Sequence, residues 1–138
     1  MLRVESAQWR DQVSAAIARG FDMLVTMLAV DDAGVVVWLR LRNSSGVDGV
    51  LSVDASHGLE SLTELLPGCA WYEREIAEMF GVAFHGHAVT PLLLPEGSAP
   101  LMLKSALLET RQSTPWPGEK DPGGVTARRR QLPPGVRA

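Results

Sequence analysis

The chain contains Asp22-Met-Leu-Val-Thr-Met-Leu-Ala-Val30, then Asp31-Asp-Ala-Gly34, then Val35-Val-Val-Trp-Leu-Arg-Leu-Arg42. The first run is short and apolar, while the last is rich in β-branched residues and alternates strictly from Trp38 onward. The two aspartates and the glycine between the runs are a turn signal. This stretch therefore predicts two antiparallel strands joined by a tight turn.

The segments on both sides of this hairpin predict a third strand and a helix. From Ser6 to Arg19 the apolar residues recur at helical spacing, and Gly20 follows as a natural stop. After a second turn at Asn43-Ser-Ser-Gly46, the run from Gly49 to Asp54 is typical of a strand. The sequence therefore predicts an α+β fold, a small and mostly antiparallel β-sheet packed by helices on one face.

The clearest helix is predicted over residues 70–80, with Gly81 as its end. Arg74 and Glu78 lie four residues apart on it, so we expect them to form an ion pair. Its apolar stripe consists of Tyr72, Ile76, Met79 and Phe80.

Shorter segments complete the chain around this helix. Residues 61–66 predict a short helix or helical turn that Pro67-Gly68 closes. Residues 82–95 predict irregular structure, and residues 101–108 are compatible with either a strand or a helix.

The composition limits the classes of protein to which the chain can belong. Its 138 residues, 46% of them hydrophobic, are enough for one core without disulfides or metal. The longest apolar run, residues 23–30, is far shorter than the roughly 20 residues of a membrane-spanning helix. A single cysteine, Cys69, excludes a disulfide framework and any multi-cysteine metal cluster on this chain.

Charge and proline divide the chain into a body, residues 1–114, and a basic Pro/Gly-rich C-terminal arm, residues 115–138. The body has a net charge of −6 and the arm +3. So many prolines and glycines cannot propagate a helix or a central strand, so we expect an extended arm, and a disordered tail is the competing interpretation. Trp116, between two prolines, is a candidate anchor on another surface. The acidic body argues against nucleic acid as a partner, despite three consecutive arginines in the arm.

Two sets of residues could carry chemistry. Glu75 and Glu78 fall within roughly 60° of each other on the helix, close enough for a carboxylate pair. His85 and His87, with His57 or Cys69, could ligate a metal, although an H-x-H spacing is weak evidence. A solvated helix face and ordinary packing are the competing interpretations.

The run from Trp71 to His87 resembles the signature of the C-type subunit, the 30 kDa subunit, of proton-pumping NADH:quinone oxidoreductase, respiratory complex I. A weaker resemblance extends to most of the chain, including Lys104 and the Pro-Trp-Pro-Gly sequence around Trp116. Many fixed residue types fall at fixed offsets, so the signature is specific. Its residues here are Trp71, Glu73, Arg74, Glu75, Glu78, Phe80, Gly81, Phe84, Gly86 and His87.

This resemblance implies a structural and assembly subunit of the peripheral arm, with no complete active site. It implies no cofactor on this chain, since FMN, the iron–sulfur clusters and quinone would be bound by partner subunits. The expected partners are the hydrogenase-like D-type subunit, the B-type subunit and other peripheral-arm subunits, on the cytoplasmic face of a bacterial plasma membrane. Glu73, Arg74 and Glu78 would order the Gly-His turn or meet the partner, and Gly81 and Gly86 would be required by the backbone.

Some residues differ from the family pattern. Glu78 replaces the usual Asp, Ala88 and Pro91 stand where Pro and Arg are common, and Leu103 replaces an Arg. The sequence therefore leaves open a paralogous complex or the equivalent subunit of a related membrane-bound nickel–iron hydrogenase. A stand-alone metal-dependent hydrolase using Glu75, Glu78, His85 and His87 is the alternative from another class.

Overall fold

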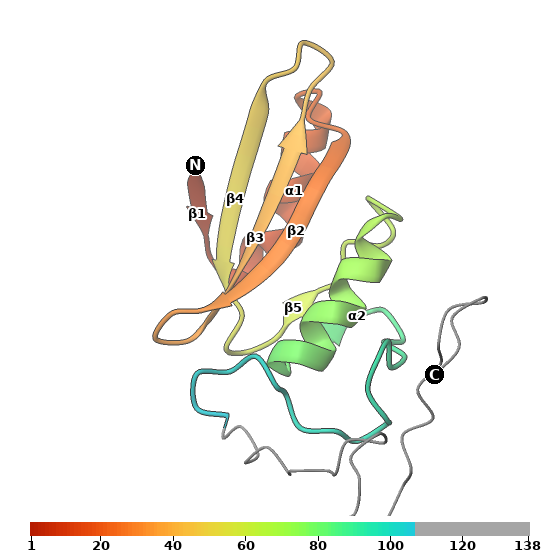
Figure 1. Ribbon diagram of the computed structural model, residues 1–138. Helices are drawn as coiled ribbons and strands as arrows, with labels where there is room; N and C mark the ends of the chain where they lie inside the picture. Colours follow the sequence, from red (N-terminus) through yellow and green to blue (C-terminus); the bar gives the residue numbers. More distant parts are fainter. Residues whose placement is uncertain (107–138) are drawn as a thin grey trace, which may run out of the picture. The chain divides into compact units, whose positions relative to one another are not determined.

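The computed structural model describes residues 1–106, which form a four-stranded sheet with helices on one face (Figure 1). The sheet order is β1-β4-β3-β2, with β1 parallel to β4 and the other neighbours antiparallel. The helical elements are η1 (Ser6–Gln8, a 3-10 turn), α1 (Trp9–Ala18) and α2 (Cys69–Phe80). The strands are β1 (Leu2–Val4), β2 (Met23–Asp31), β3 (Val35–Arg42), β4 (Asp48–Asp54), β5 (Leu59–Glu60) and β6 (Phe84–His85).

The predicted hairpin is confirmed as β2 and β3. Its turn uses Ala33 with φ +56° and Gly34 with φ +136°, and the Asp32 N–H donates to the Gly34 carbonyl. Glycine adopts such an angle at little cost, which explains Gly34, whereas Ala33 is a non-glycine residue in the left-handed region. A register irregularity between Leu24 and Thr26 interrupts the pairing near the start of β2.

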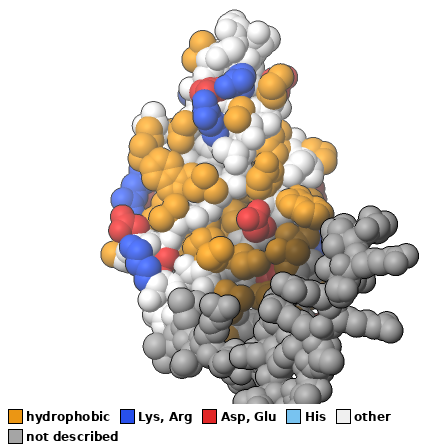
Figure 2. Space-filling view, viewed as in Figure 1, with side chains coloured by type: hydrophobic (Ala, Val, Ile, Leu, Met, Phe, Trp, Pro, Cys, Tyr) orange, Lys and Arg blue, Asp and Glu red, His pale blue; other side chains and the backbone are white. Residues whose placement is uncertain are grey.

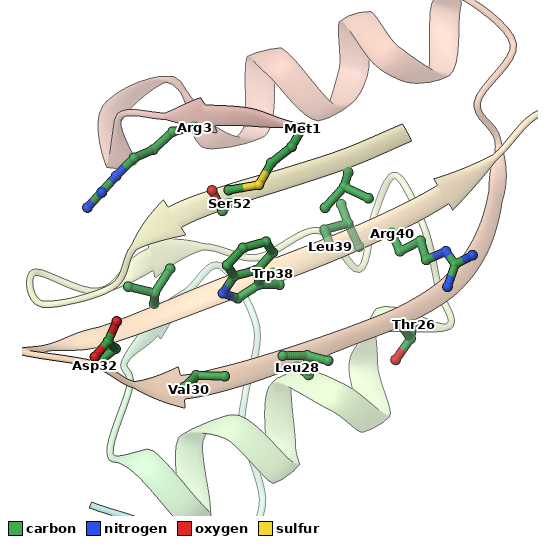
Figure 3. A pocket seen from close by; sticks show the side chains of 12 residues that line it. Met1, Arg3, Thr26, Leu28, Val30, Asp32, Trp38, Leu39, Arg40 and Ser52 are labelled. Atoms are coloured by element: carbon green, nitrogen blue, oxygen red, sulfur yellow. The ribbon is translucent and has the colours of Figure 1, made fainter. Parts of the chain in front are cut away.

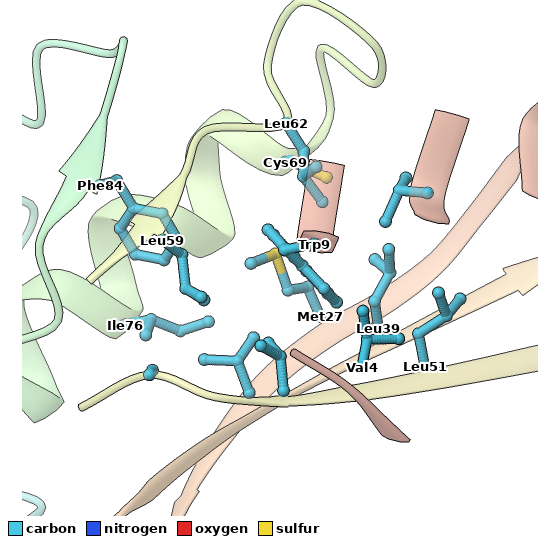
Figure 4. Close-up of a cluster of buried hydrophobic side chains, with 14 of the residues drawn as sticks. Val4, Trp9, Met27, Leu39, Leu51, Leu59, Leu62, Cys69, Ile76 and Phe84 are labelled. Carbon is cyan, nitrogen blue, oxygen red and sulfur yellow. The ribbon is translucent and has the colours of Figure 1, made fainter. Parts of the chain in front are cut away.

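The hydrophobic core lies between the sheet and the two helices (Figure 4). From β3 it receives Val37, Leu39 and Leu41, all fully buried, as the alternation predicts. The helices contribute the fully buried Trp9 and Val13 from α1, and Cys69 and Ile76 from α2. Burying each large aliphatic side chain contributes roughly 1.5–3 kcal/mol, so this layer dominates the stability.

Three short strands were not predicted. β1 pairs in parallel with the middle of β4, and β5 pairs in parallel with β6. The expectation of irregular structure from residue 82 onward is therefore wrong for Phe84 and His85. Residues 101–106, for which a strand or a helix was expected, form turns instead.

The arm of residues 115–138, with Trp116, lies outside the described residues. Among residues 1–106, neither helix has the length and apolar character that crossing a membrane would require.

Candidate functional site

Helix α2 and the two turns around it bring the predicted signature residues together. The helix ends at Gly81, whose φ is +72° and whose N–H donates to the Ala77 carbonyl. An added Cβ at Gly81 would lie 2.8 Å from Cγ of Pro100, so glycine is required by conformation and by space. Gly86 also has a positive φ, +87°, with open space around it. Both glycines therefore serve the backbone, as predicted.

Glu73 lies fully buried on the inner side of α2. Its carboxylate accepts hydrogen bonds from the Ser61 hydroxyl (2.8 Å) and the Leu62 N–H (2.7 Å). Nδ1 of His87 lies 3.2 Å from the same carboxylate. Since a buried carboxylate is costly unless paired and hydrogen-bonded, this network fixes α2 to the segment after β5 and to the Gly-His turn.

Arg74 and Glu78 face the outer side of α2 and hold the loop that follows β6. Arg74 donates to the carbonyls of Thr90 (Nε, 2.9 Å) and Pro91 (Nη2, 2.7 Å). The Glu78 carboxylate accepts from three consecutive backbone N–H groups, those of residues 92–94. The predicted ion pair between these two side chains is wrong, because each binds the backbone of the loop instead.

The contacts of Glu78 also set its acidity. Partial desolvation would raise its pKa, but the N–H donors of Leu94, Leu93 and Leu92, together with the charge of Arg74, outweigh it. The net result is a pKa below the ordinary glutamate value. The carboxylate is therefore ionised at neutral pH and acts as an acceptor for the loop.

The other predicted residues divide between core and surface. Phe84 is buried in the core, and Phe80 is partly buried against it. Trp71 is 59% exposed, with the Arg74 guanidinium 5.7 Å from its ring centre. Lys104 lies at the β2–β3 turn, where its N–H donates to Asp31.

The alternative chemistry receives no support from the described geometry. Glu75 is exposed, whereas the Glu78 carboxylate is occupied by loop amides. Within residues 1–106, no three His, Cys, Asp or Glu side chains gather closely enough to hold a metal ion. Burial, with a smaller contribution from Glu73, raises the pKa of Cys69 to about 12. Cys69 is therefore a packing residue in this fold.

Four large apolar side chains around α2 and its loop are exposed. Trp71 and Leu93 lie beside the Arg74 and Glu78 contacts, and the Met102 N–H donates to the Met79 carbonyl of α2. We call this set the α2 surface. It comprises Trp71 (59% exposed), Leu93 (74%), Leu101 (53%) and Met102 (60%).

Residues 2–110 match the family described as the 30 Kd subunit of respiratory-chain NADH dehydrogenase. The chain belongs to this family. The match covers nearly all of the described fold, including the α2 signature, so the resemblance inferred from residues 71–87 is confirmed.

Curated relatives of this family member match over shorter stretches. The C/D-type subunit of NADH-quinone oxidoreductase from Pectobacterium atrosepticum is 49% identical over 39 residues, 28% of this chain and 6% of the relative. The C-type subunit from Jannaschia sp. is 50% identical over 38 residues, 28% of this chain and 18% of the relative. The C/D-type subunit from Buchnera aphidicola is 38% identical over 56 residues, 40% of this chain and 9% of the relative. The matched segments thus span under a fifth of these relatives' lengths.

A solved structure shares the fold of this family member. A chain of the membrane-bound sulfane sulfur reductase, an archaeal respiratory membrane complex, superposes with a TM-score of 0.62 at 21% identity. The superposition covers 69% of this chain and 62% of the other.

Several residues of the site were not predicted. Ser61 and Leu62, which bind Glu73, lie in the segment 61–66, where a helical turn was predicted but no contact with Glu73. The loop partners of Arg74 and Glu78 are backbone groups, which a sequence does not distinguish. The residues that gave a signal were the charged residues of α2 and the glycines and histidine of the signature, Gly81, Gly86 and His87.

Proposed function

We propose that this chain is a structural and assembly subunit of the peripheral arm of a proton-pumping NADH:quinone oxidoreductase, without a catalytic centre of its own. One observation carries the proposal: the charged signature residues of α2 bind the chain's own backbone and turns. Charged side chains that bind the chain's own backbone determine the shape of the surface around them. The α2 surface, with its four exposed apolar side chains, is the product of that arrangement.

The partner that we propose for the α2 surface is the hydrogenase-like D-type subunit, with the B-type subunit and other peripheral-arm subunits nearby. Support comes from the relatives that carry the combined designation C/D. Large exposed apolar side chains, an aromatic among them, are typical of the centre of a protein interface. The chain would then be peripheral at the cytoplasmic face of the membrane, attached through the complex.

The cofactors of the reaction would belong to those partners. FMN, the iron–sulfur clusters and quinone need ligand sets or pockets that we assign to the neighbouring subunits. Of the possible ligands in this chain's signature, Glu73, Glu78 and His87 are committed to contacts within the fold, while Glu75 is exposed. Under this proposal, the chain supports electron transfer from NADH to quinone only by holding the cofactor-bearing subunits in place.

A second candidate is the equivalent subunit of a related membrane-bound complex, such as a nickel–iron hydrogenase. The fold shared with a chain of an archaeal membrane-bound sulfane sulfur reductase favours it. The two candidates share the docking role and differ in the electron donor and acceptor. The proteins recovered with the chain would distinguish them.

The test is affinity purification of the tagged full-length chain from membranes of its own organism, with mass spectrometry and an NADH:quinone reductase assay. Recovery of D-type and B-type subunits with this activity would support the first candidate. Recovery of hydrogenase-type partners without it would support the second. Isolation of the chain alone would contradict both.

Two variants locate the contact within this experiment. Leu93→Asp should reduce recovery of the D-type subunit about tenfold or more, because Leu93 is the most exposed residue of the α2 surface. The matched control is Val47→Asp, which changes another exposed apolar residue (55%) in the β3–β4 turn. Equal recovery with both variants would refute docking through the α2 surface.

The arm is proposed to contribute to the same assembly. Deletion of residues 115–138 should leave residues 1–106 folded, as judged by circular dichroism, and should weaken recovery of the complex. An unchanged yield of intact complex would refute a docking role for the arm.

A further inference from the structure

The face of the sheet opposite the helices is uncovered in residues 1–106. Helices α1 and α2 lie on the other face, while an open groove of about 520 Å³ runs across this one (Figure 3). We call it the open sheet face. The outward apolar residues of its three strands are Leu28, Val30, Val36, Trp38 and Val50, and Met1 and the buried Leu39 also line the groove.

Two of the apolar residues of this face, Leu28 and Val30, are exposed, and the other three are half-buried. Leu28 is 43% exposed and Val30 44% exposed, and the Trp38 ring lies between them and β4 (Figure 3). The strand alternation places them there, since Val37, Leu39 and Leu41 of β3 are buried in the core. Hydrophobic side chains also spread across the middle of the space-filling view (Figure 2). A partly exposed apolar sheet face of this kind is typical of an interaction site.

The border of the open sheet face is basic, although the described body is acidic. Residues 1–106 contain seven Lys and Arg against thirteen Asp and Glu. Yet Arg3 and Arg40 line the groove, and Arg42 follows two residues later on the same face of β3. Arg40 and Arg42 share a single carboxylate, that of Asp48, at 2.9 and 2.6 Å from their Nε atoms.

Counted with its carboxylates, this border keeps a small excess of positive charge, with Arg3, Arg40, Arg42 and Lys104 against Asp32, Asp48 and Asp54. Within residues 1–106, Arg3 has no ion-pair partner within 4 Å, although the pKa of Asp54 is lowered by hydrogen bonds from Ser56 and also by the charge of Arg3. Asp32, the acidic residue that lines the groove, lies 3.7 Å from Nζ of Lys104. Acidic groups on a partner would therefore be complementary to Arg3 and to the Arg40–Arg42 pair.

We propose that the open sheet face is a second docking surface of this chain, and that its occupant is another subunit presenting an apolar strip bordered by Asp and Glu. The inference rests on the proposed function, because the occupant belongs to the same complex. It adds a contact on the side opposite the helices, separate from the α2 surface. The chain would then lie between two neighbours, with α1 and α2 toward one side and the bare sheet toward the other.

Site-specific photo-crosslinking in the assembled complex tests this inference. A benzophenone amino acid is placed at Val30, on the open sheet face, and at Ser14, an exposed position of α1, as the matched control. We expect Val30 to crosslink to an acidic segment of another subunit at least tenfold more efficiently than Ser14. Crosslinking to a second copy of this chain, to its own C-terminal residues, or at equal efficiency from both positions would overturn the inference.

Charge reversal tests the basic border separately. Arg3→Glu should lower the Val30 crosslink several-fold and make it less sensitive to salt, since an attraction becomes a repulsion. Arg19→Glu, an exposed residue just after α1, is the matched control and should change nothing. Equal effects of both variants, or none, would contradict the acidic partner.

These outcomes separate the inference from the proposed function. If the complex is recovered with its D-type subunit but Val30 does not crosslink to another subunit, only the second docking surface fails. If no complex is recovered with the wild-type chain, the proposed function itself fails.

Discussion

Helix α2 carries two glutamates, Glu73 and Glu78, whose carboxylates both bind backbone groups of other segments. Glu73 lies on the inner side of the helix and Glu78 on the outer side. Each carboxylate accepts backbone N–H groups from another segment, Glu73 one such group and Glu78 three. Glu73 does so with no exposure, inside the core, whereas Glu78 does so at the surface. The inner side therefore determines whether α2 is attached to the fold, and the outer side determines the shape of the loop that α2 presents.

The largest effect that this comparison predicts concerns Cys69 on the inner side. With a pKa of about 12, its thiolate should be roughly a thousandfold scarcer near pH 8 than that of an unfolded cysteine with a pKa of about 8.5. We expect almost no alkylation by iodoacetamide in the native protein and rapid alkylation in denaturant, measured by mass spectrometry. Comparable rates in both states would show that the inner side is open to solvent.

Removing the buried carboxylate should have the next largest effect. Glu73→Ala leaves the Ser61 hydroxyl and the Leu62 N–H without their acceptor and opens a cavity, at a cost of about 3–5 kcal/mol in the free energy of unfolding. Glu75→Ala, on the exposed side of the same helix, should change it by about 0.5 kcal/mol or less. Urea denaturation of both variants measures the difference. A small effect of Glu73→Ala would remove the distinction between the two sides.

Replacing the glycines that end α2 and form the Gly-His turn should lower the stability of the fold by a smaller amount. Both have a positive φ, so an alanine costs roughly 1–2 kcal/mol at either position. Gly81→Ala should cost more than Gly86→Ala, because its Cβ would overlap the Pro100 ring. Thermal unfolding of the two variants provides the measurement. Equal melting temperatures would mean that the Pro100 segment moves away without cost.

The smallest effect is expected at Glu78. Since its pKa is lowered in the folded protein, the ionised form stabilises the loop above the unfolded pKa of about 4.3, and this stabilisation is lost as pH falls through the lower folded value. Glu78→Gln should make hydrogen exchange of the Leu92–Leu94 amides faster at neutral pH and remove the loss of their protection below about pH 4. The global unfolding midpoint should hardly change. A large loss of global stability would show that Glu78, like Glu73, holds α2 to the fold.

The sequence predicted the elements that have a local pattern. The hairpin, the third strand and both helices follow from periodicity and turn residues, within one to three residues at their ends. β1, β5 and β6 have only two or three residues each, and their pairing joins distant segments. Such strands carry too short a pattern to be distinguished from a loop.

The site was predictable in its members and less so in their contacts. Positions 73, 74 and 78 were identified from the α2 signature, but charged residues on a helix are normally solvated, so the complete burial of Glu73 gave no signal. The spacing of Arg74 and Glu78 favoured an ion pair, yet the loop offers both residues backbone partners with fixed positions. Those partners exist only once the loop has folded against α2.

The parallel pairing of β1 with β4 affects the order in which the strands of the sheet assemble during folding. Leu2 pairs with Leu51, so β1 has no neighbour in the sheet until about fifty residues later in the chain. Closing so long a loop is entropically unfavourable compared with forming the β2–β3 hairpin, so the hairpin should form before β1 joins the sheet. β1, which precedes the other three strands of the sheet in the sequence, would then be the last to join it.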